Sequence, residues 1–200
     1  MKTPTLDFFY FIGSTYTHLA VHRAQDAAAR VGVALVWRPF SVRTLMREQN
    51  NIPFAGKPVK SAYMWRDLER RAMRLGVPFT KPPSYPIDAQ EQANRVATLA
   101  ATEGWCPAFT RAAYAAWFLG GEDPGTPAAL RRILAALGKD ADAALAAADG
   151  DAVRARYAAE TDRARTLGIF GSPTFAGADG EIFWGDDRLD DAIDWCLAHA

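Results

Sequence analysis

The segment Asp7-Phe8-Phe9-Tyr10-Phe11-Ile12-Gly13-Ser14-Thr15-Tyr16-Thr17-His18-Leu19-Ala20 says more about the fold than any other part of the chain. The apolar run from Leu6 to Phe11 predicts a buried strand. Helical spacing of apolar residues from Thr15 to Val31 then predicts a helix that faces a sheet. Ser14 is expected at the start of this helix, where free N–H groups and the helix dipole favour negative charge. A plain N-cap is the other role open to this serine.

A second strand is predicted directly after the helix. The segment from Val33 to Phe40 is rich in β-branched and aromatic residues, and Pro39 ends it. A strand, a helix and a strand in this order form a right-handed βαβ unit, with a ligand crevice at the carboxyl end of the first strand. Ser14 is therefore expected at that crevice.

The middle of the chain has a different composition. Residues 57–166 consist of Ala-, Arg- and Leu-rich helical segments separated by prolines, which predicts an all-helical insertion. After it, two short strand patterns flank a turn at residues 177–180, which predicts a hairpin. Asp187 to Leu197 is then expected to form a final amphipathic helix.

This order of elements predicts the α/β class, and specifically a thioredoxin-like fold. Its thioredoxin-like domain would comprise residues 1–56 and 167–200. The all-helical domain, residues 57–166, would be inserted between the βαβ and ββα halves.

Composition limits the partners and the compartment. The 200 residues contain 23 acidic and 23 basic side chains, so no net field would recruit nucleic acid or an anionic membrane, and we expect a small-molecule substrate. No apolar run has membrane-spanning length, and the early Asp7 argues against a secretory signal. The two cysteines, Cys106 and Cys196, form neither a CxxC nor a metal-ligand pattern, so we interpret them as ordinary thiols in a reducing cytoplasm.

No metal site is predicted from the histidines. His18 and His22 share a helix face, but no third ligand is spaced to complete a zinc site. We assign both to packing or to the wall of the site. His18, four residues after Ser14, is also a candidate substrate contact.

Two later segments carry further candidate residues. Pro173 precedes a strand and is a candidate cis-proline, in which case Ser172 would present its N–H and C=O to an extended peptide-like ligand. A trans-proline at a strand start fits equally well. Asp186 or Asp187 would cap the last helix and could bind an ammonium group, although a cap with solvated charges is as good an interpretation.

The helix after residue 57 carries charges at local spacing. Asp67 with Arg70 or Arg71 would form i,i+3 or i,i+4 ion pairs, which is typical of a solvated helix face.

Several motifs together resemble the thioredoxin-fold glutathione enzymes of the kappa transferase and 2-hydroxychromene-2-carboxylate isomerase family. They span most of the chain, in the family's order. Thr15 and His18 stand where the family commonly has a proline and an aromatic residue. The matching motifs are Ser14-Thr15-Tyr16-Thr17-His18-Leu19-Ala20, an asparagine (Asn50 or Asn51) before Pro53, Lys60-x-x-Tyr63-x-x-x-Asp67-x-x-Arg70, Gly171-Ser172-Pro173-Thr174-Phe175 and Trp184-Gly185-x-Asp187-Arg188-Leu189.

The resemblance implies a glutathione site and a reaction. The Ser14 hydroxyl would bind the glutathione sulfur, and the other implied glutathione contacts are Asn50, Asn51, Ser172, Pro173, Asp186 and Asp187. The candidate substrate contacts are Tyr16, His18, Lys57, Lys60 and Tyr63. The implied reaction is the glutathione-dependent isomerisation of 2-hydroxychromene-2-carboxylate, or a related bicyclic compound, to trans-o-hydroxybenzylidenepyruvate, and relatives of this kind imply a homodimer.

Two other functions remain open at this point. A kappa-type transferase would conjugate glutathione to electrophiles, and a non-catalytic module would bind thiols or peptides at the cis-proline edge. A DsbA-like disulfide oxidoreductase is excluded, because dithiol exchange needs a CxxC that Gly13-Ser14-Thr15-Tyr16 lacks.

Overall fold

The computed structural model describes residues 3–54, 56–82 and 84–199. Its strands are β1 (Thr5–Tyr10), β2 (Ala34–Pro39), β3 (Thr174–Ala176) and β4 (Ile182–Trp184). Its helices are α1 (Thr17–Arg30), α2 (Val42–Glu48), α3 (Pro58–Leu75), α4 (Gln92–Glu103), α5 (Cys106–Phe118), α6 (Pro127–Ala136), α7 (Ala141–Asp149), α8 (Asp151–Thr166), the short 3₁₀ helix η1 (Asp186–Arg188) and α9 (Leu189–Ala198).

The four strands form one mixed sheet in the order β2-β1-β3-β4. β1 runs parallel to β2 and antiparallel to β3, and β3 pairs antiparallel with β4. Phe8 lies opposite Phe175 in the ladder, and their rings stack at 5.1 Å between centroids. The βαβ unit and the hairpin predicted from the sequence are both confirmed.

The two faces of β1 separate the helices into layers. Side chains of a strand alternate between the faces of a sheet, so Phe8 and Tyr10 point to one side and Phe9 to the other. Phe8 and Tyr10 pack in the buried cluster that includes residues of α1, α4, α5 and α9. Phe9 packs with Leu45 of α2 and Ala164 of α8 in a second cluster on the opposite face.

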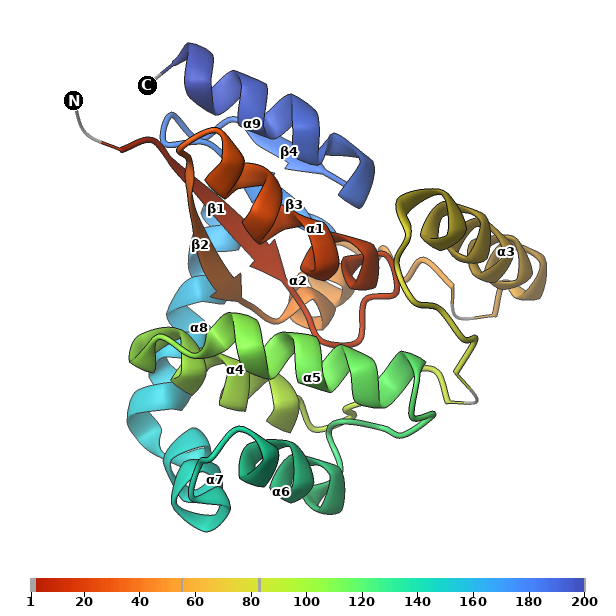
Figure 1. Ribbon diagram of the computed structural model, residues 1–200, viewed down its shortest axis with the longest axis vertical. Helices are drawn as coiled ribbons and strands as arrows, with labels where there is room; N and C mark the ends of the chain where they lie inside the picture. Colours follow the sequence, from red (N-terminus) through yellow and green to blue (C-terminus); the bar gives the residue numbers. More distant parts are fainter. Residues whose placement is uncertain (1–2, 55, 83, 200) are drawn as a thin grey trace.

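The inserted helices share the core of the sheet (Figure 1). Figure 1 shows α4 to α7 below the sheet and α3 standing to its right, while α8 leads the chain back toward β3. Phe109 of α5 and Val96 of α4 belong to the same buried cluster as Phe8. The thioredoxin-like fold with an all-helical insertion is thereby confirmed. In the described part of the chain, every helix is too short or too polar to cross a membrane.

Candidate active site

The turn after β1 places Ser14 ahead of α1. Gly13 has φ +130°, and a Cβ there would lie 2.6 Å from a ring carbon of Phe11, so the turn requires glycine. α1 begins only at Thr17, with Tyr16 at the N-cap and no side-chain cap bond. Residues 14–16 form a tighter turn before the helix, so the predictions that Ser14 starts the helix and caps it are wrong.

The Ser14 hydroxyl instead contacts the segment before β3. It donates a 2.6 Å hydrogen bond to the carbonyl oxygen of Ser172, and the Ser172–Pro173 peptide bond is cis. The Ser172 hydroxyl accepts a 2.9 Å bond from the N–H of Phe11 and lies 2.9 Å from the hydroxyl of Thr17. Ser14 and Ser172 therefore meet at the carboxyl end of β1, as expected for two residues that the resemblance assigns to one site.

Two side chains of the insertion hold the Ser14 turn in place. Asn94 of α4 accepts a 2.7 Å bond from the N–H of Ile12 and donates a 2.9 Å bond to its carbonyl. The hydroxyl of Tyr114 of α5 lies 2.9 Å from the carbonyl oxygens of both Phe11 and Ser14. Both side chains are buried, and the sequence analysis did not find either of them.

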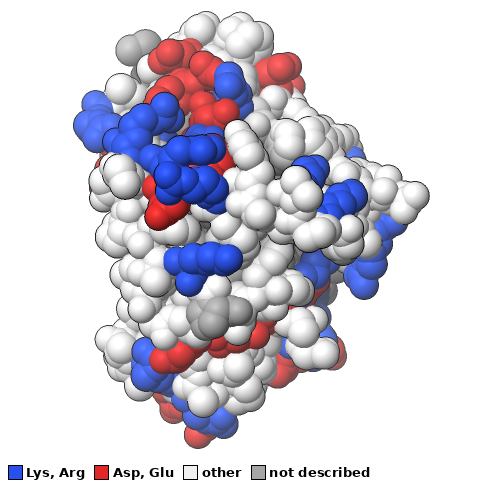
Figure 2. Space-filling view, turned by 90° about the vertical axis from the view of Figure 1, so that its right-hand side faces the viewer, with Lys and Arg blue, Asp and Glu red and all other residues white. Residues whose placement is uncertain are grey.

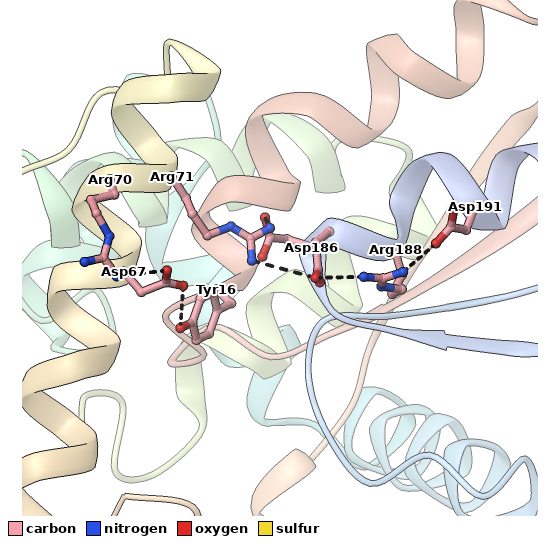
Figure 3. A network of polar contacts seen from close by, with 8 residues as sticks. Tyr16, Asp67, Arg70, Arg71, Asp186, Arg188 and Asp191 are labelled. Carbon is pink, nitrogen blue, oxygen red and sulfur yellow. Dashed lines mark hydrogen bonds and ion pairs between the residues drawn. The ribbon is translucent and has the colours of Figure 1, made fainter.

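A polar network connects α3 to this turn and to η1 (Figure 3). The Tyr16 hydroxyl donates a 3.0 Å bond to Asp67, and Arg71 donates a 2.8 Å bond to Asp186. Burial and the Asp67 carboxylate raise the pKa of the Tyr16 phenol, which therefore stays protonated and donates. Asp67 also forms the predicted pair with Arg70, at 3.4 Å. The prediction of a solvated face is wrong for Arg71.

Asp186 is buried beneath the network, with 1% of its surface exposed. Burial raises the pKa of its carboxyl to about 6, and the charge of Arg71 opposes this rise. Asp187 is more exposed, and its carboxylate lies 3.2 Å from Arg188 and 4.0 Å from Arg71. The helix α9 begins at Leu189 with no side-chain cap bond, so the prediction that Asp186 or Asp187 caps it is wrong.

The candidate asparagines follow α2. Asn50 and Asn51 are both exposed. The neighbouring Gln49 donates a 3.4 Å bond to the carbonyl of Ile169, which places this segment beside the chain that leads to Ser172. The side-chain amides of both asparagines lack protein partners in the described structure.

The predicted substrate contacts Lys57, Lys60 and Tyr63 lie at the start of α3. Figure 2 shows the side of the molecule that is on the right in Figure 1. Basic and acidic side chains lie next to each other in the upper part of this face. Lys57 donates a 2.9 Å bond to the carbonyl of Ile52, and Lys60 lies over the ring of Phe54. Tyr63 is exposed over 63% of its surface.

His18 does not reach the surface of the site. It is fully buried, its ring stacks on Phe118 at 3.9 Å, and its Nε2–H donates to the carbonyl of Pro78 at 2.8 Å. Burial lowers the pKa of the imidazole to about 4, so it is neutral at physiological pH. The assignment to packing is confirmed, and the candidate role as a substrate contact is wrong for this buried ring.

Both cysteines are free, buried thiols, and neither forms a hydrogen bond to Ser14 in the described structure. Cys106 is buried beside Tyr10 and Thr110, and burial raises the pKa of its thiol. Cys196 is buried on α9 and contacts the carbonyl of Thr5. Within residues 3–54, 56–82 and 84–199 no cluster of His, Cys, Asp and Glu could hold a metal ion.

Comparison with known proteins places this arrangement in a family. The family model of the DSBA-like thioredoxin domain matches residues 5–194. The chain is 33% identical over 190 residues to 2-hydroxychromene-2-carboxylate isomerase of Sphingobium xenophagum, covering 94% of this chain and 95% of that protein. The chain belongs to the DsbA-like family that includes these isomerases.

Two further matches agree with this DsbA-like family assignment. Glutathione S-transferase kappa 1 of Caenorhabditis elegans is 33% identical over 85 residues, which are 42% of this chain and 38% of that protein. The solved structure of selenomethionine 2-hydroxychromene-2-carboxylate isomerase superposes with a TM-score of 0.84 at 23% identity, covering 98% of this chain and 95% of that one. This structural match shows that the fold is shared along almost the whole chain.

Proposed function

We propose that this protein is a glutathione-dependent isomerase that converts 2-hydroxychromene-2-carboxylate, or a related bicyclic compound, to trans-o-hydroxybenzylidenepyruvate. The observation that carries the proposal is the position of the Ser14 hydroxyl, 2.6 Å from the Ser172 carbonyl at the carboxyl end of β1. This turn holds a hydroxyl and no thiol, so it can stabilise the thiolate of a bound ligand but cannot exchange disulfides. The similarity to the Sphingobium isomerase over 94% of the chain supports the same reaction class.

The groups around Ser14 fit the parts of glutathione. Ser172 is 9% exposed, and its N–H has no partner among the described residues, which leaves it free to pair with the cysteinyl carbonyl of a tripeptide. Pro173 would fix the backbone next to Ser172, at the place where the tripeptide would pair with it. Asp187, with Asp186 behind it, would hold the γ-glutamyl ammonium, and Asn50 or Asn51 would contact the tripeptide backbone.

Glutathione, when bound, supplies a thiol that acts as the nucleophile once it is deprotonated. Ser14 would turn its hydroxyl from the Ser172 carbonyl toward the sulfur and donate a hydrogen bond to it, which lowers the pKa of the thiol. The N–H groups of Thr15 and Tyr16 precede α1 and make no backbone hydrogen bond in the described structure. They add positive potential at the same place.

The start of α3 would bind the substrate. The exposed ring of Tyr63 suits a flat bicyclic compound, and the Tyr16 ring borders the same region. Lys60 is the better candidate for the substrate carboxylate, because the ammonium group of Lys57 already donates to the Ile52 carbonyl.

A kappa-type transferase is the second candidate, and the match to the kappa transferase of C. elegans favours it. A turnover assay with 2-hydroxychromene-2-carboxylate, with and without glutathione, tests the proposal. We expect isomerisation that requires glutathione and leaves its concentration unchanged. Consumption of glutathione with an electrophile would support the transferase, and binding without turnover would support a non-catalytic module.

We also propose a homodimer, as the family resemblance implies. Sedimentation at micromolar concentrations should show a species of twice the 21.9 kDa chain mass. A monomer at all of these concentrations would contradict the dimer.

A further inference from the structure

Arg43 of α2 places a guanidinium group against the turn that carries Ser14. A Cβ added to Gly13 would lie 3.7 Å from Arg43 Nη2, and the guanidinium carbon of Arg43 lies 4.8 Å from the centroid of the Phe11 ring. Arg43 is partly buried in this position. Its positive charge is therefore held at the residue before Ser14, where the glutathione sulfur is proposed to bind.

Backbone carbonyls hold this guanidinium in place. Arg43 Nη1 donates a 2.6 Å bond to the carbonyl of Asp88, and Nη2 donates to the carbonyl of Ile87. The Asp88 carboxylate is occupied elsewhere, because it accepts bonds from the N–H of Ala93 and from the N–H and the side chain of Asn94. Among the described residues Arg43 forms no ion pair, so no bonded carboxylate cancels its charge.

The other titratable groups of this region are bonded elsewhere or neutral. Glu91 accepts a hydrogen bond from the Tyr157 phenol, and the Asp123 carboxylate accepts from backbone N–H groups. Burial raises the pKa of the Tyr85 phenol and the charge of Arg43 opposes this rise, so the phenol is neutral at physiological pH. A fixed positive charge without a bonded anion favours negative charge nearby.

We propose that the charge of Arg43 acts through space to stabilise the thiolate form of glutathione bound at Ser14. This inference rests on the proposed function, because it takes glutathione as the ligand and Ser14 as the contact of its sulfur. Arg43 does not touch the ligand. A guanidinium stays protonated over the whole range in which a thiol titrates, so its effect does not vanish as the pH rises.

Coulomb's law gives the size of the expected effect. A unit positive charge about 10 Å from a thiolate lowers the pKa of the thiol by about one unit at an effective dielectric constant of about 20. The hydroxyl of Ser14 acts only in contact with the sulfur, whereas the field of Arg43 extends beyond contact distance. The two groups therefore contribute separately to the pKa of the bound thiol.

A pH titration of bound glutathione, followed by the ultraviolet absorbance of the thiolate, tests this charge. Arg43→Met removes the charge and should raise the pKa of the bound thiol by about 0.5–1 unit above the wild-type value. Arg43→Lys keeps the charge but loses the fork that bonds two carbonyls, and it should stay within about 0.3 unit of wild type. Arg43→Gln, which retains an N–H donor, replaces Arg43→Met if that variant does not fold, and it should give the same rise.

Two controls separate the charge of Arg43 from the shape of the site. Arg47→Met is the same substitution one turn further along α2, at an exposed position where water and salt screen the charge, and it should shift the pKa by less than about 0.2 unit. S-methylglutathione has no ionisable thiol. Its dissociation constant, measured by calorimetry, should therefore differ by less than about twofold between wild type and Arg43→Met.

Three results would overturn the inference while wild type still binds glutathione. The first is an unchanged thiol pKa in Arg43→Met. The second is an equal rise in Arg43→Met and Arg43→Lys, because the bonds to the carbonyls and not the charge would then decide the pKa. The third is a loss of affinity for S-methylglutathione in Arg43→Met that equals the loss for glutathione. Failure of wild type to bind glutathione would instead reject the proposed function itself.

Discussion

The Ser14 hydroxyl donates its hydrogen bond to the carbonyl oxygen of Ser172 at a distance of 2.6 Å. A hydroxyl has one proton, so it cannot donate to this carbonyl and to a ligand sulfur at the same time. Ligand binding therefore has to release the Ser172 carbonyl as the hydroxyl turns. The contact also fixes the turn after β1 against the cis-proline, which keeps the serine at the crevice.

The Ser14 turn depends on Asn94, which pairs with both backbone groups of Ile12 and also donates a 2.8 Å bond to Asp88. We expect Asn94→Asp to lower the free energy of unfolding by about 3 kcal/mol. The new carboxylate cannot donate to the Ile12 carbonyl, and it faces the Asp88 carboxylate in a buried environment. Urea unfolding measures the loss.

Asn51→Asp makes the same chemical change at an exposed position, and it should change the stability by less than about 0.5 kcal/mol. Equal unfolding midpoints for the two variants would show that Asn94 does not hold the turn.

The bond between Tyr16 and Asp67 should couple the inserted helix α3 to the site. Tyr16→Phe removes the only donor of this bond, and we expect a loss of about 1 kcal/mol in unfolding free energy, since the pair is half-buried. In a double-mutant cycle with Asp67→Ala, which removes the acceptor, the coupling energy should be about 0.5–1.5 kcal/mol. Additive effects of the two substitutions would mean that the bond contributes nothing to stability.

Buried His18 should make the fold sensitive to acid. Its pKa is about 4 in the folded protein and about 6.5 in an unfolded chain, so between these values the unfolded chain binds the extra proton. Above pH 6.5 this group therefore does not lower the free energy of unfolding. As the pH is lowered toward 4, His18 lowers the free energy of unfolding by up to about 1.4 kcal/mol per pH unit.

The variant His18→Gln cannot titrate and retains an N–H for the Pro78 carbonyl. Unfolding free energies measured from pH 7 to pH 4 should therefore fall less steeply in this variant than in wild type. Parallel curves for the two proteins would contradict a neutral buried His18.

The order of the elements could be predicted from the sequence, because the spacing of apolar residues indicates which side chains are buried. The buried residues of the structure agree with that spacing. The start of α1 was misplaced, because the turn at residues 14–16 is formed by local backbone hydrogen bonds, which do not change the spacing of apolar residues in the sequence. The βαβ rule placed Ser14 at the crevice, and the resemblance to a glutathione-binding family implied that Ser172 belongs to the same site.

The long-range polar partners were not predictable in the same way. Asn94 and Tyr114 look like ordinary residues of amphipathic helices, and only the packing of α4 and α5 on the sheet turns them toward the backbone of the Ser14 turn. Asp67 stands at helical spacing from Arg71, which suggests a local pair, whereas Arg71 in fact bonds to Asp186 on η1, 115 residues further along the chain.

Stabilisation of a glutathione thiolate by Ser14 is the central claim. The ultraviolet absorbance of the thiolate, followed against pH with glutathione bound, reports the pKa of the bound thiol. In wild type this pKa should lie at least about one unit below the reference value of about 8.5 for a thiol. Ser14→Thr, which retains the hydroxyl, serves as the matched control and should stay near the wild-type value.

The titration of Ser14→Ala decides the claim. Without the hydroxyl, the pKa of the bound glutathione thiol should return toward about 8.5, and turnover should fall at least about tenfold. Expressed as a free energy, this fall in turnover should be larger than the loss of unfolding free energy caused by removing the hydrogen bond to Ser172. Superimposable titration curves for wild type and Ser14→Ala, with turnover within about twofold, would contradict a catalytic role for this serine.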